Sequence, residues 1–204
     1  MSKKPGVLLH AAAAYDFTIG FWLLGRERAF RERLVRLARL AASEAVLDVG
    51  CGTGSLAIAA KRQVGPTGSV YGIDASPEML ARARKKAAKA GVEVAFQNAS
   101  AQALPFGDAT FDAVLASVML HHLPRKARQE LAAEIHRVLK PSGRVLIVEF
   151  GLAPRERKGF LARWHRHGYV RPLELVGLVK EAGLSTIESG PVGIRDLHFV
   201  LAKR

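Results

Sequence analysis

The sequence contains 204 residues, a length typical of one compact domain. With 49% hydrophobic and 24% charged residues it is not intrinsically disordered, and no apolar run reaches the roughly 18 residues that a membrane-spanning helix requires. A net charge of +13 favours an anionic partner, such as nucleic acid, an acidic membrane surface or an anionic substrate, although a solvated arginine-rich surface would also account for it. The lone Cys51 excludes an internal disulfide and a multi-cysteine metal site, and we expect no metal.

The first fifteen residues loosely resemble a secretory signal, because Lys3 and Lys4 precede short apolar stretches. Gly6 and His10 interrupt those stretches, which is unfavourable for a signal. We therefore expect a cytoplasmic location, with peripheral contact at the inner face of the membrane as an alternative.

A helix is predicted next, over Arg26–Ala42, since apolar residues recur there at steps of three and four. Such a stripe is typical of a helix that packs on a sheet, and a membrane-surface helix is the alternative. The stripe consists of Phe30, Leu34, Leu37 and Ala41.

From residue 45 onward, short strand-like runs alternate with helical patterns, which is typical of βαβ units around a parallel sheet. Ser76 and Pro77 are expected to start a helix, and Gly91 and Gly183 to end helices in the left-handed conformation. Strands are predicted at Ala45–Gly50, Ser69–Asp74, Val92–Gln97, Phe111–Ser117 and Arg144–Phe150, with weaker ones near Leu184–Glu188 and Leu197–Ala202. Helices are predicted at Ser55–Gln63, Pro77–Ala90, Pro124–Leu139 and Pro172–Ala182.

The strongest motif is the segment 47–54 (LDVGCGTG), which follows an apolar strand and opens a helix. Gly50, Gly52 and Gly54 allow a sharp turn and let a ligand approach the main chain. A GxGxxG loop would suggest a dinucleotide, but here the spacing is GxGxG and Asp48 precedes it. A carboxylate disfavours a pyrophosphate, whereas a ligand with a cationic amino group and a sulfonium would favour it. A tight turn from strand to helix without any ligand is the alternative.

A second acidic residue, Asp74, ends the next strand about twenty residues after the glycines. In that position a carboxylate can accept hydrogen bonds from both ribose hydroxyls of an adenosine. A local turn ahead of Ser76 and Pro77 is the alternative explanation of this aspartate.

These segments together resemble the successive motifs of class I methyltransferases, and the pattern is nearest to the type 11 group, which includes the ubiquinone and menaquinone biosynthesis C-methyltransferases. The resemblance covers about residues 45–150 and is loose outside them. The segments that carry it are 48–54, 72–80 (GIDASPEML), 103–106 (ALPF) with Phe111-Asp112, and 139–144 (LKPSGR).

The resemblance implies an α/β fold of the Rossmann type, in which a seven-stranded, mostly parallel sheet has the strand order 3-2-1-4-5-7-6, with helices on both faces and an N-terminal helical cap. It implies S-adenosylmethionine as cofactor, with S-adenosylhomocysteine as product. Asp48 and the glycine loop would hold the methionine moiety, Asp74 the ribose, and Met79 would lie beside the adenine. The full set of expected cofactor-binding residues is Tyr15, Asp48, Gly50, Cys51, Gly52, Gly54, Asp74, Ala75, Met79, Ser100, Ala101 and Ser117.

The chain departs from the family at the adenine contact. Similar proteins often carry Gly-Asp-Ala before the Leu-Pro-Phe segment, with the aspartate bonded to the adenine amino group, whereas this chain has Ala99-Ser100-Ala101. The hydroxyl of Ser100 is a shorter and neutral acceptor, so a weaker adenine contact is expected.

Three residues are candidates for catalysis. His121 and His122 follow the fourth strand, in a stretch that lines the methionine end of the cofactor and the methyl-transfer face in similar proteins, and they are therefore candidates for a base or for substrate contacts. Tyr15, within a Tyr-Asp pair that caps the active site of similar enzymes, is the third. The alternative is that the histidines only end the strand and that Tyr15 only packs against neighbouring aromatic residues.

We therefore expect one methyltransferase domain over 1–204. It would consist of an N-terminal helical cap (1–43), a cofactor-binding core (44–150), a variable substrate segment (151–171), and a final helix with two strands (172–204). Basic and aromatic residues alternate in the substrate segment, which suits a membrane interface, stacking on RNA, or a basic lid over a small pocket.

The predicted activity is in-line transfer of a methyl group to a small-molecule or lipid-like, quinone-like acceptor. The alternatives are an RNA methyltransferase, a nicotinamide-dependent oxidoreductase and a non-catalytic cofactor-binding protein. Peripheral membrane contact is compatible with this activity, nucleic acid is the less favoured partner, and the sequence leaves the oligomeric state open.

Overall fold

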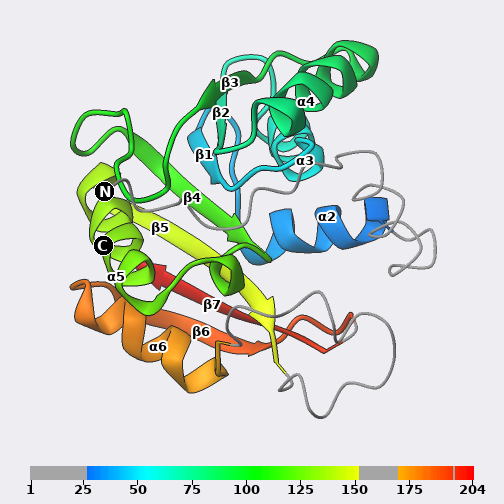
Figure 1. Ribbon diagram of the computed structural model, residues 1–204. Coiled ribbons are helices and arrows are strands. Elements are labelled where there is room, and N and C mark those ends of the chain that lie inside the picture. The colour runs from blue at the N-terminus through cyan, green and yellow to red at the C-terminus, as the bar shows by residue number, and fades with distance from the viewer. Residues whose placement is uncertain (1–26, 152–169, 195) are drawn as a thin grey trace.

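The computed structural model describes residues 27–151, 170–194 and 196–204 (Figure 1). Its strands form one seven-stranded sheet in the order β3-β2-β1-β4-β5-β7-β6, which confirms the predicted topology. The strands β1 to β5 pair in parallel, and β7 runs antiparallel to both β5 and β6. The strands are β1 (Ala45–Val49), β2 (Ser69–Asp74), β3 (Ala95–Asn98), β4 (Phe111–Ser117), β5 (Leu139–Phe150), β6 (Ser185–Pro191) and β7 (Leu197–Lys203). The helices are α2 (Glu27–Leu37), α3 (Ser55–Val64), α4 (Pro77–Ala90), the 3-10 turn η1 (Leu120–His122), α5 (Arg125–Val138) and α6 (Pro172–Glu181).

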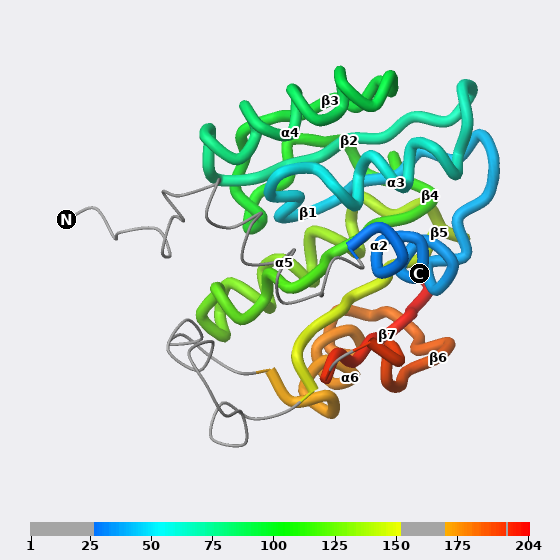
Figure 2. Tube along the Cα trace, turned by 90° about the vertical axis from the view of Figure 1, so that its right-hand side faces the viewer, coloured from blue at the N-terminus to red at the C-terminus, as the bar shows by residue number. Residues whose placement is uncertain are grey.

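Helices cover both faces of this sheet. Successive side chains of a strand point to opposite faces, so Val46 of β1 packs in one hydrophobic cluster and Leu47 in the other. The first cluster includes residues of α2 and α3, and the second includes residues of α5 and α6. Figure 2 shows α4 and β3 at one end of the sheet and α6, β6 and β7 at the other. With both faces buried, the chain offers ligands the carboxyl edge of the parallel strands.

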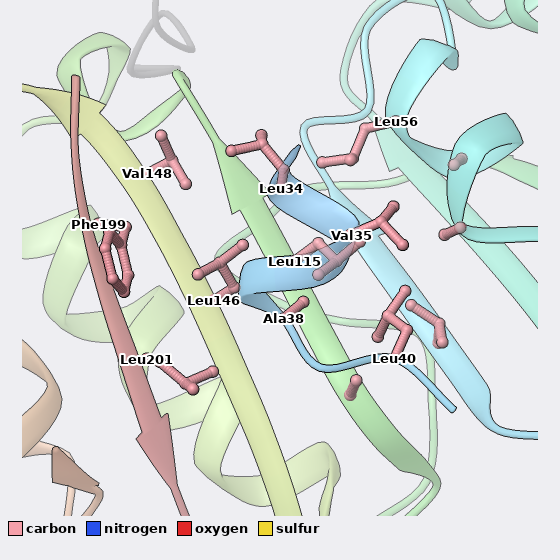
Figure 3. Close-up of a cluster of buried hydrophobic side chains, with 14 of the residues drawn as sticks. Leu34, Val35, Ala38, Leu40, Leu56, Leu115, Leu146, Val148, Phe199 and Leu201 are labelled. Atoms are coloured by element: carbon pink, nitrogen blue, oxygen red, sulfur yellow. The ribbon is translucent and has the colours of Figure 1, made fainter. Parts of the chain in front are cut away.

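The helix α2 packs on the sheet, as its apolar stripe predicts. Leu34 and Val35 are buried in the cluster drawn in Figure 3, together with Leu115 of β4 and Leu146 of β5, and Phe30 belongs to the same cluster. The predicted end of this helix is wrong, because α2 stops at Leu37 and Ala41 is exposed.

The early end of α2 has a tertiary cause. The guanidinium of Arg144 on β5 donates to the carbonyl oxygens of Ala38 and Arg39, at 2.6 Å each, and pairs with both carboxylate oxygens of Glu44 at 2.8 Å. These bonds satisfy carbonyls that a longer helix would have used, and Arg39 adopts a left-handed φ of 53°. The contact also fixes α2 beside β5.

Several other predicted boundaries shift. The strand β3 starts at Ala95 rather than Val92, because the N–H of Val92 still bonds the carbonyl of Ala87 in the cap of α4. The strand β5 starts at Leu139 rather than Arg144, since Leu139 already pairs with Phe111 across an irregularity in the ladder. The strand β6 runs to Pro191, because β7 pairs with it along its whole length.

The predicted helix caps are confirmed. The hydroxyl of Ser76 accepts a hydrogen bond from the N–H of Met79 at 3.3 Å, and Pro77 is the first residue of α4. Gly91 and Gly183 are left-handed, with φ of 65° and 82°. Among the described residues, no helix is both long and apolar enough to cross a membrane.

Candidate functional site

The glycine loop turns the chain sharply between β1 and α3, at the carboxyl edge of the sheet. Gly50, Gly52 and Gly54 have φ of 66°, 54° and 78°, a backbone conformation that residues other than glycine rarely adopt. A Cβ at Gly50 would lie 3.0 Å from Cβ of Met119, and one at Gly54 would lie 2.8 Å from the ring of Phe96. The loop therefore requires glycine both for its conformation and for its packing.

Asp48 is the most unusual residue of the site, because its carboxylate is buried at the end of β1 and one of its oxygens lacks a hydrogen bond from the described residues. Only 2% of the residue is exposed, and its Oδ2 has no hydrogen-bond partner among the described residues. Burial raises the pKa of Asp48 to about 7, although the charge of Arg31 acts in the opposite direction. Such a carboxylate is poised to bind a cation.

Asp48 faces a small cavity at the start of α3. Four of the residues predicted to bind the cofactor line this cavity: Asp48, Gly50, Cys51 and Ser117. The Oγ of Ser117 is buried and also has no hydrogen-bond partner among the described residues. Two unsatisfied polar atoms in one cavity indicate a binding site for a polar ligand.

Asp74 lies at the end of β2 and links that strand to the glycine loop. One carboxylate oxygen accepts a hydrogen bond from the N–H of Gly52 at 2.9 Å, and the other accepts one from the N–H of Ser76 at 2.8 Å. Burial raises the pKa of Asp74, whereas these two N–H groups oppose the rise. The local turn is therefore present, and each oxygen keeps a further lone pair that a ribose hydroxyl could use.

The residues predicted near the adenine lie outside the lining of the Asp48 cavity. Met79 is buried in the first turn of α4, and Ala75, directly after β2, is exposed. Ser100 is exposed, and its hydroxyl accepts a hydrogen bond from the N–H of Gln102 at 3.2 Å, while Ala101 is half-buried. The serine hydroxyl is thus already engaged in a local turn, in line with a weaker adenine contact.

A strained turn follows β4. Val118 has φ of 55°, which is costly for a β-branched residue, and its N–H bonds the carbonyl of Val148 on β5 at 2.8 Å. The turn brings Met119 against the glycine loop and leads directly into η1. Backbone strain of this kind is concentrated at functional sites, where surrounding contacts maintain it.

The paired histidines lie in η1 and have a partner that the sequence did not reveal. Nδ1 of His121 lies 3.0 Å from Oε2 of Glu149, at the end of β5, and both residues are buried. The ring of His122 lies on that of His121, with centroids 4.0 Å apart. No local pattern marks Glu149, which is an acidic residue inside an apolar strand. Tyr15 lies outside the described residues.

A second missed residue is Arg31 of α2. It lines the same cavity as Asp48, and its charge lowers the pKa of that carboxyl. The side chain is only 13% exposed, it lies 3.6 Å from a carboxylate oxygen of Glu27, and its Nε has no hydrogen-bond partner among the described residues. The cavity thus has a cation and an anion on its walls, which suits a zwitterionic ligand.

Comparison with known proteins gives a consistent answer. Residues 46–143 match the family model of a methyltransferase domain. The chain is 38% identical over 152 residues to the demethylmenaquinone methyltransferase of Thermus thermophilus, covering 74% of this chain and 68% of that protein. It is 37% identical over 142 residues to the ubiquinone/menaquinone biosynthesis C-methyltransferase of Bdellovibrio bacteriovorus, covering 69% of this chain and 58% of that enzyme.

A similar structure is the crystal structure of an S-adenosylmethionine-dependent methyltransferase from Aquifex aeolicus. It has a TM-score of 0.71 and 28% sequence identity, covering 84% of this chain and 88% of that one. The chain belongs to the class I S-adenosylmethionine-dependent methyltransferases, and S-adenosylmethionine is its cofactor. Within that class it is a relative of the quinone-biosynthesis C-methyltransferases, although it spans only 58% of the length of the Bdellovibrio enzyme. A nicotinamide-dependent oxidoreductase is therefore not supported.

The residues present fit this cofactor. Its methionine moiety carries an ammonium, a sulfonium and a carboxylate, and the cavity offers the unsatisfied carboxylate of Asp48 together with the guanidinium of Arg31. Gly50 itself carries no side chain at this bend, and the side chain of Met119 packs against it.

The pKa of Asp48 predicts how cofactor binding depends on pH. The ionised carboxylate attracts the cationic cofactor, so binding lowers this pKa and protonation weakens binding. Because the pKa of the free protein is about 7, affinity should fall as the pH drops from 7 to 5, by up to about tenfold per pH unit. The ammonium and the carboxylate of the cofactor keep their charges over that interval. Isothermal titration calorimetry at several pH values measures the effect.

The matched control is Asp48→Asn. This variant should bind the cofactor more weakly, with an affinity nearly constant between pH 5 and 7. An equally steep pH dependence in the variant, or a flat profile in the unaltered protein, would contradict the role of Asp48.

Proposed function

We propose that the chain transfers the methyl group of S-adenosylmethionine to a ring carbon of a hydroquinone-like, lipid-soluble acceptor. The observation that carries this proposal is the identity of 37–38% to enzymes named for the methylation of demethylmenaquinone and for ubiquinone and menaquinone biosynthesis. The acceptor is a proposal because those names describe the relatives.

The cofactor would be held through its opposite charges. Asp48 would bind the ammonium and Arg31 the carboxylate of the methionine moiety, while Asp74 accepts hydrogen bonds from the ribose. Met79, buried at the start of α4, would support the adenine. The unsatisfied Oδ2 of Asp48 and Nε of Arg31 support this arrangement, because each atom would gain the partner that it lacks.

When bound, the cofactor supplies a methyl group on a positively charged sulfur, which is already electrophilic. The protein therefore has to hold the acceptor in line with that methyl group and to exclude water. Orientation of this kind can contribute roughly 7–11 kcal/mol in favourable cases. Ser117 and Met119, at the end of β4, lie beside the glycine loop and would shape this part of the site.

The basic surface supports peripheral contact with an anionic membrane, where a lipid-soluble acceptor would be found. Residues of the helices α2, α3 and α4 line a cavity of about 830 Å³ that is open to solvent, and basic side chains outnumber acidic ones in its lining. Two of the basic residues pair with its two glutamates, since Arg28 bonds Glu32 and Arg31 lies near Glu27. The basic residues are Arg28, Arg31, Arg36, Arg62, Lys86 and Lys89.

Methyl transfer to a reduced short-chain demethylmenaquinone tests the function. The reduced ring is electron-rich, and we expect one added methyl group on carbon, detected by mass spectrometry and NMR, together with one equivalent of S-adenosylhomocysteine. The oxidised quinone is the matched control and should not react, because its ring carbons are electron-poor. Methylation of RNA isolated from a cell extract, without any methylation of the hydroquinone, would overturn the proposal in favour of an RNA enzyme.

The ribose contact predicts the effect of changing Asp74. Replacement by alanine should weaken cofactor binding at least tenfold, because the carboxylate that meets the hydroxyls is lost. Asp74→Asn, which keeps an oxygen for the N–H of Gly52, should lose less affinity. Equilibrium dialysis gives both constants, and near-normal binding by the alanine variant would rule out the ribose contact.

The proposed carboxylate partner is tested with Arg31→Gln. This variant should bind S-adenosylmethionine about tenfold more weakly, since a charge-assisted hydrogen bond is lost. Affinity for decarboxylated S-adenosylmethionine should change little, because that analogue has no carboxylate to lose. Arg36→Gln, on an exposed position of the same helix, is the control and should leave both affinities unchanged. Equal losses for both ligands would exclude a contact between Arg31 and the carboxylate.

A further inference from the structure

A buried carboxylate and imidazole form the best-organised polar cluster beside the cofactor cavity. Oε2 of Glu149 lies 3.0 Å from Nδ1 of His121, and Oε1 accepts a hydrogen bond from the N–H of Leu120 at 2.6 Å. The exposed fractions of the two side chains are 1% for Glu149 and 8% for His121. The carboxylate of Glu149 therefore fixes both the backbone of η1, at Leu120, and the imidazole ring of His121.

The electrostatics keep Glu149 ionised. Burial by itself would raise the pKa of Glu149, but His121 and the N–H groups of Leu120 and Phe150 outweigh it, and the pKa lies below its usual range. An ionised carboxylate only accepts hydrogen bonds, so Nδ1 of His121 must carry a hydrogen. In the neutral ring, the lone pair is then on Nε2, the atom that accepts protons.

Other groups fix the position of the pair. Nε of Arg128 on α5 donates to the carbonyl of Leu120 at 2.9 Å, and the rings of His122 and Phe150 lie against His121. In the part of the chain that the structure describes, the charged or titratable groups beside the pair include His122 on η1 and Arg128 on α5, and Glu174 on α6 interacts with Arg128. The ring of His121 is held from several elements at once.

The pair lies at the edge of the sheet that holds the cofactor cavity. Ser117, which lines that cavity, pairs with Val148 in the sheet, and Glu149 is the next residue of β5. Adjacent strands are about 4.8 Å apart, so the carboxyl end of β5 lies one strand away from the cavity wall. The strained turn at Val118 then places η1 over the carboxyl ends of β4 and β5.

We propose that His121 accepts, at Nε2, the proton that the methyl acceptor releases, and that Glu149 is the positioning residue that holds the imidazole in the required tautomer. This inference rests on the proposed function, because a hydroquinone loses one proton for each methyl group gained on carbon. Glu149 acts through His121 and touches no reacting atom.

The step is balanced without any oxidant. The hydroxyl proton of the acceptor passes to Nε2, and the ring carbon uses the electron pair released into the ring to bond the methyl carbon. The bond between sulfur and the methyl carbon breaks, and its electron pair stays on sulfur, which becomes neutral. The ring carbon then loses its hydrogen as a proton, the oxygen regains one, and the ring is aromatic again. The net products are the methylated hydroquinone, S-adenosylhomocysteine and one proton.

The experiment compares Glu149→Gln and Glu149→Asp with the unaltered protein, using the reduced short-chain demethylmenaquinone. Glu149→Gln should lower kcat about 10- to 100-fold, with little change in the KM of the acceptor or in the affinity for the cofactor. Glu149→Asp should recover part of the lost kcat. His121→Asn should lower kcat by roughly 100-fold or more, the usual contribution of a general base. Glu188→Gln, which removes a half-exposed carboxylate of β6 that pairs with Arg39, is the control and should retain kcat.

A second readout needs no acceptor. The nitrogen chemical shifts of His121, measured by NMR on the folded protein with cofactor bound, should show a hydrogen on Nδ1 and a lone pair on Nε2, and Glu149→Gln should convert this state into a mixture of tautomers. A hydrogen on Nε2 in the unaltered protein, or full kcat in folded Glu149→Gln and His121→Asn, would overturn the proposal. Failure of the unaltered protein to methylate the hydroquinone would instead reject the proposed function, and this proton role with it.

Discussion

The site depends on one constraint, which is the burial of the Asp48 carboxylate at the end of β1. A pKa raised from 3.8 to about 7 corresponds to roughly 4 kcal/mol of disfavoured ionisation, an order-of-magnitude figure. A structural carboxylate could avoid this cost by pairing fully, but Oδ2 of Asp48 has no partner among the described residues. A cationic ligand removes the cost, and this links the stability of the strand end to the chemistry of S-adenosylmethionine.

The surrounding residues follow from that constraint. The glycine loop gives a ligand access to the carboxylate, and Asp74 holds the loop through the N–H of Gly52. Arg31 comes from α2. The position of this helix is fixed because Arg144 donates hydrogen bonds to the carbonyl oxygens of Ala38 and Arg39, the two residues that follow it. The N-terminal helix therefore contributes both packing and a charge to the cavity.

The edge of β4 and β5 is organised separately, around a second buried carboxylate. Glu149 is satisfied by His121 and by the backbone of η1, whereas Asp48 is not fully paired, so the two acids have different properties in the same sheet. The strained conformation of Val118 connects the two regions, with a cost on the order of 1–3 kcal/mol. The acid that we propose to bind a cation and the acid that we propose to orient a histidine thus lie at strand ends of the same sheet, with β4 between their two strands.

The sequence by itself determined the glycine loop, the positions of Asp48 and Asp74 at strand ends, and the caps at Ser76 and Gly91, because each depends on local periodicity, on backbone conformation or on a motif of few residues. The strand order followed from the resemblance to class I methyltransferases and not from these local patterns. The sequence did not determine the end of α2, the role of Arg31 or the pairing of Glu149 with His121. These features depend on contacts between residues far apart in the chain, such as the 28 positions that separate His121 from Glu149. Local patterns contain no information on which distant side chain will meet a given group. Only the packing of β5 beside β4, and of α2 on the sheet, decided those partners.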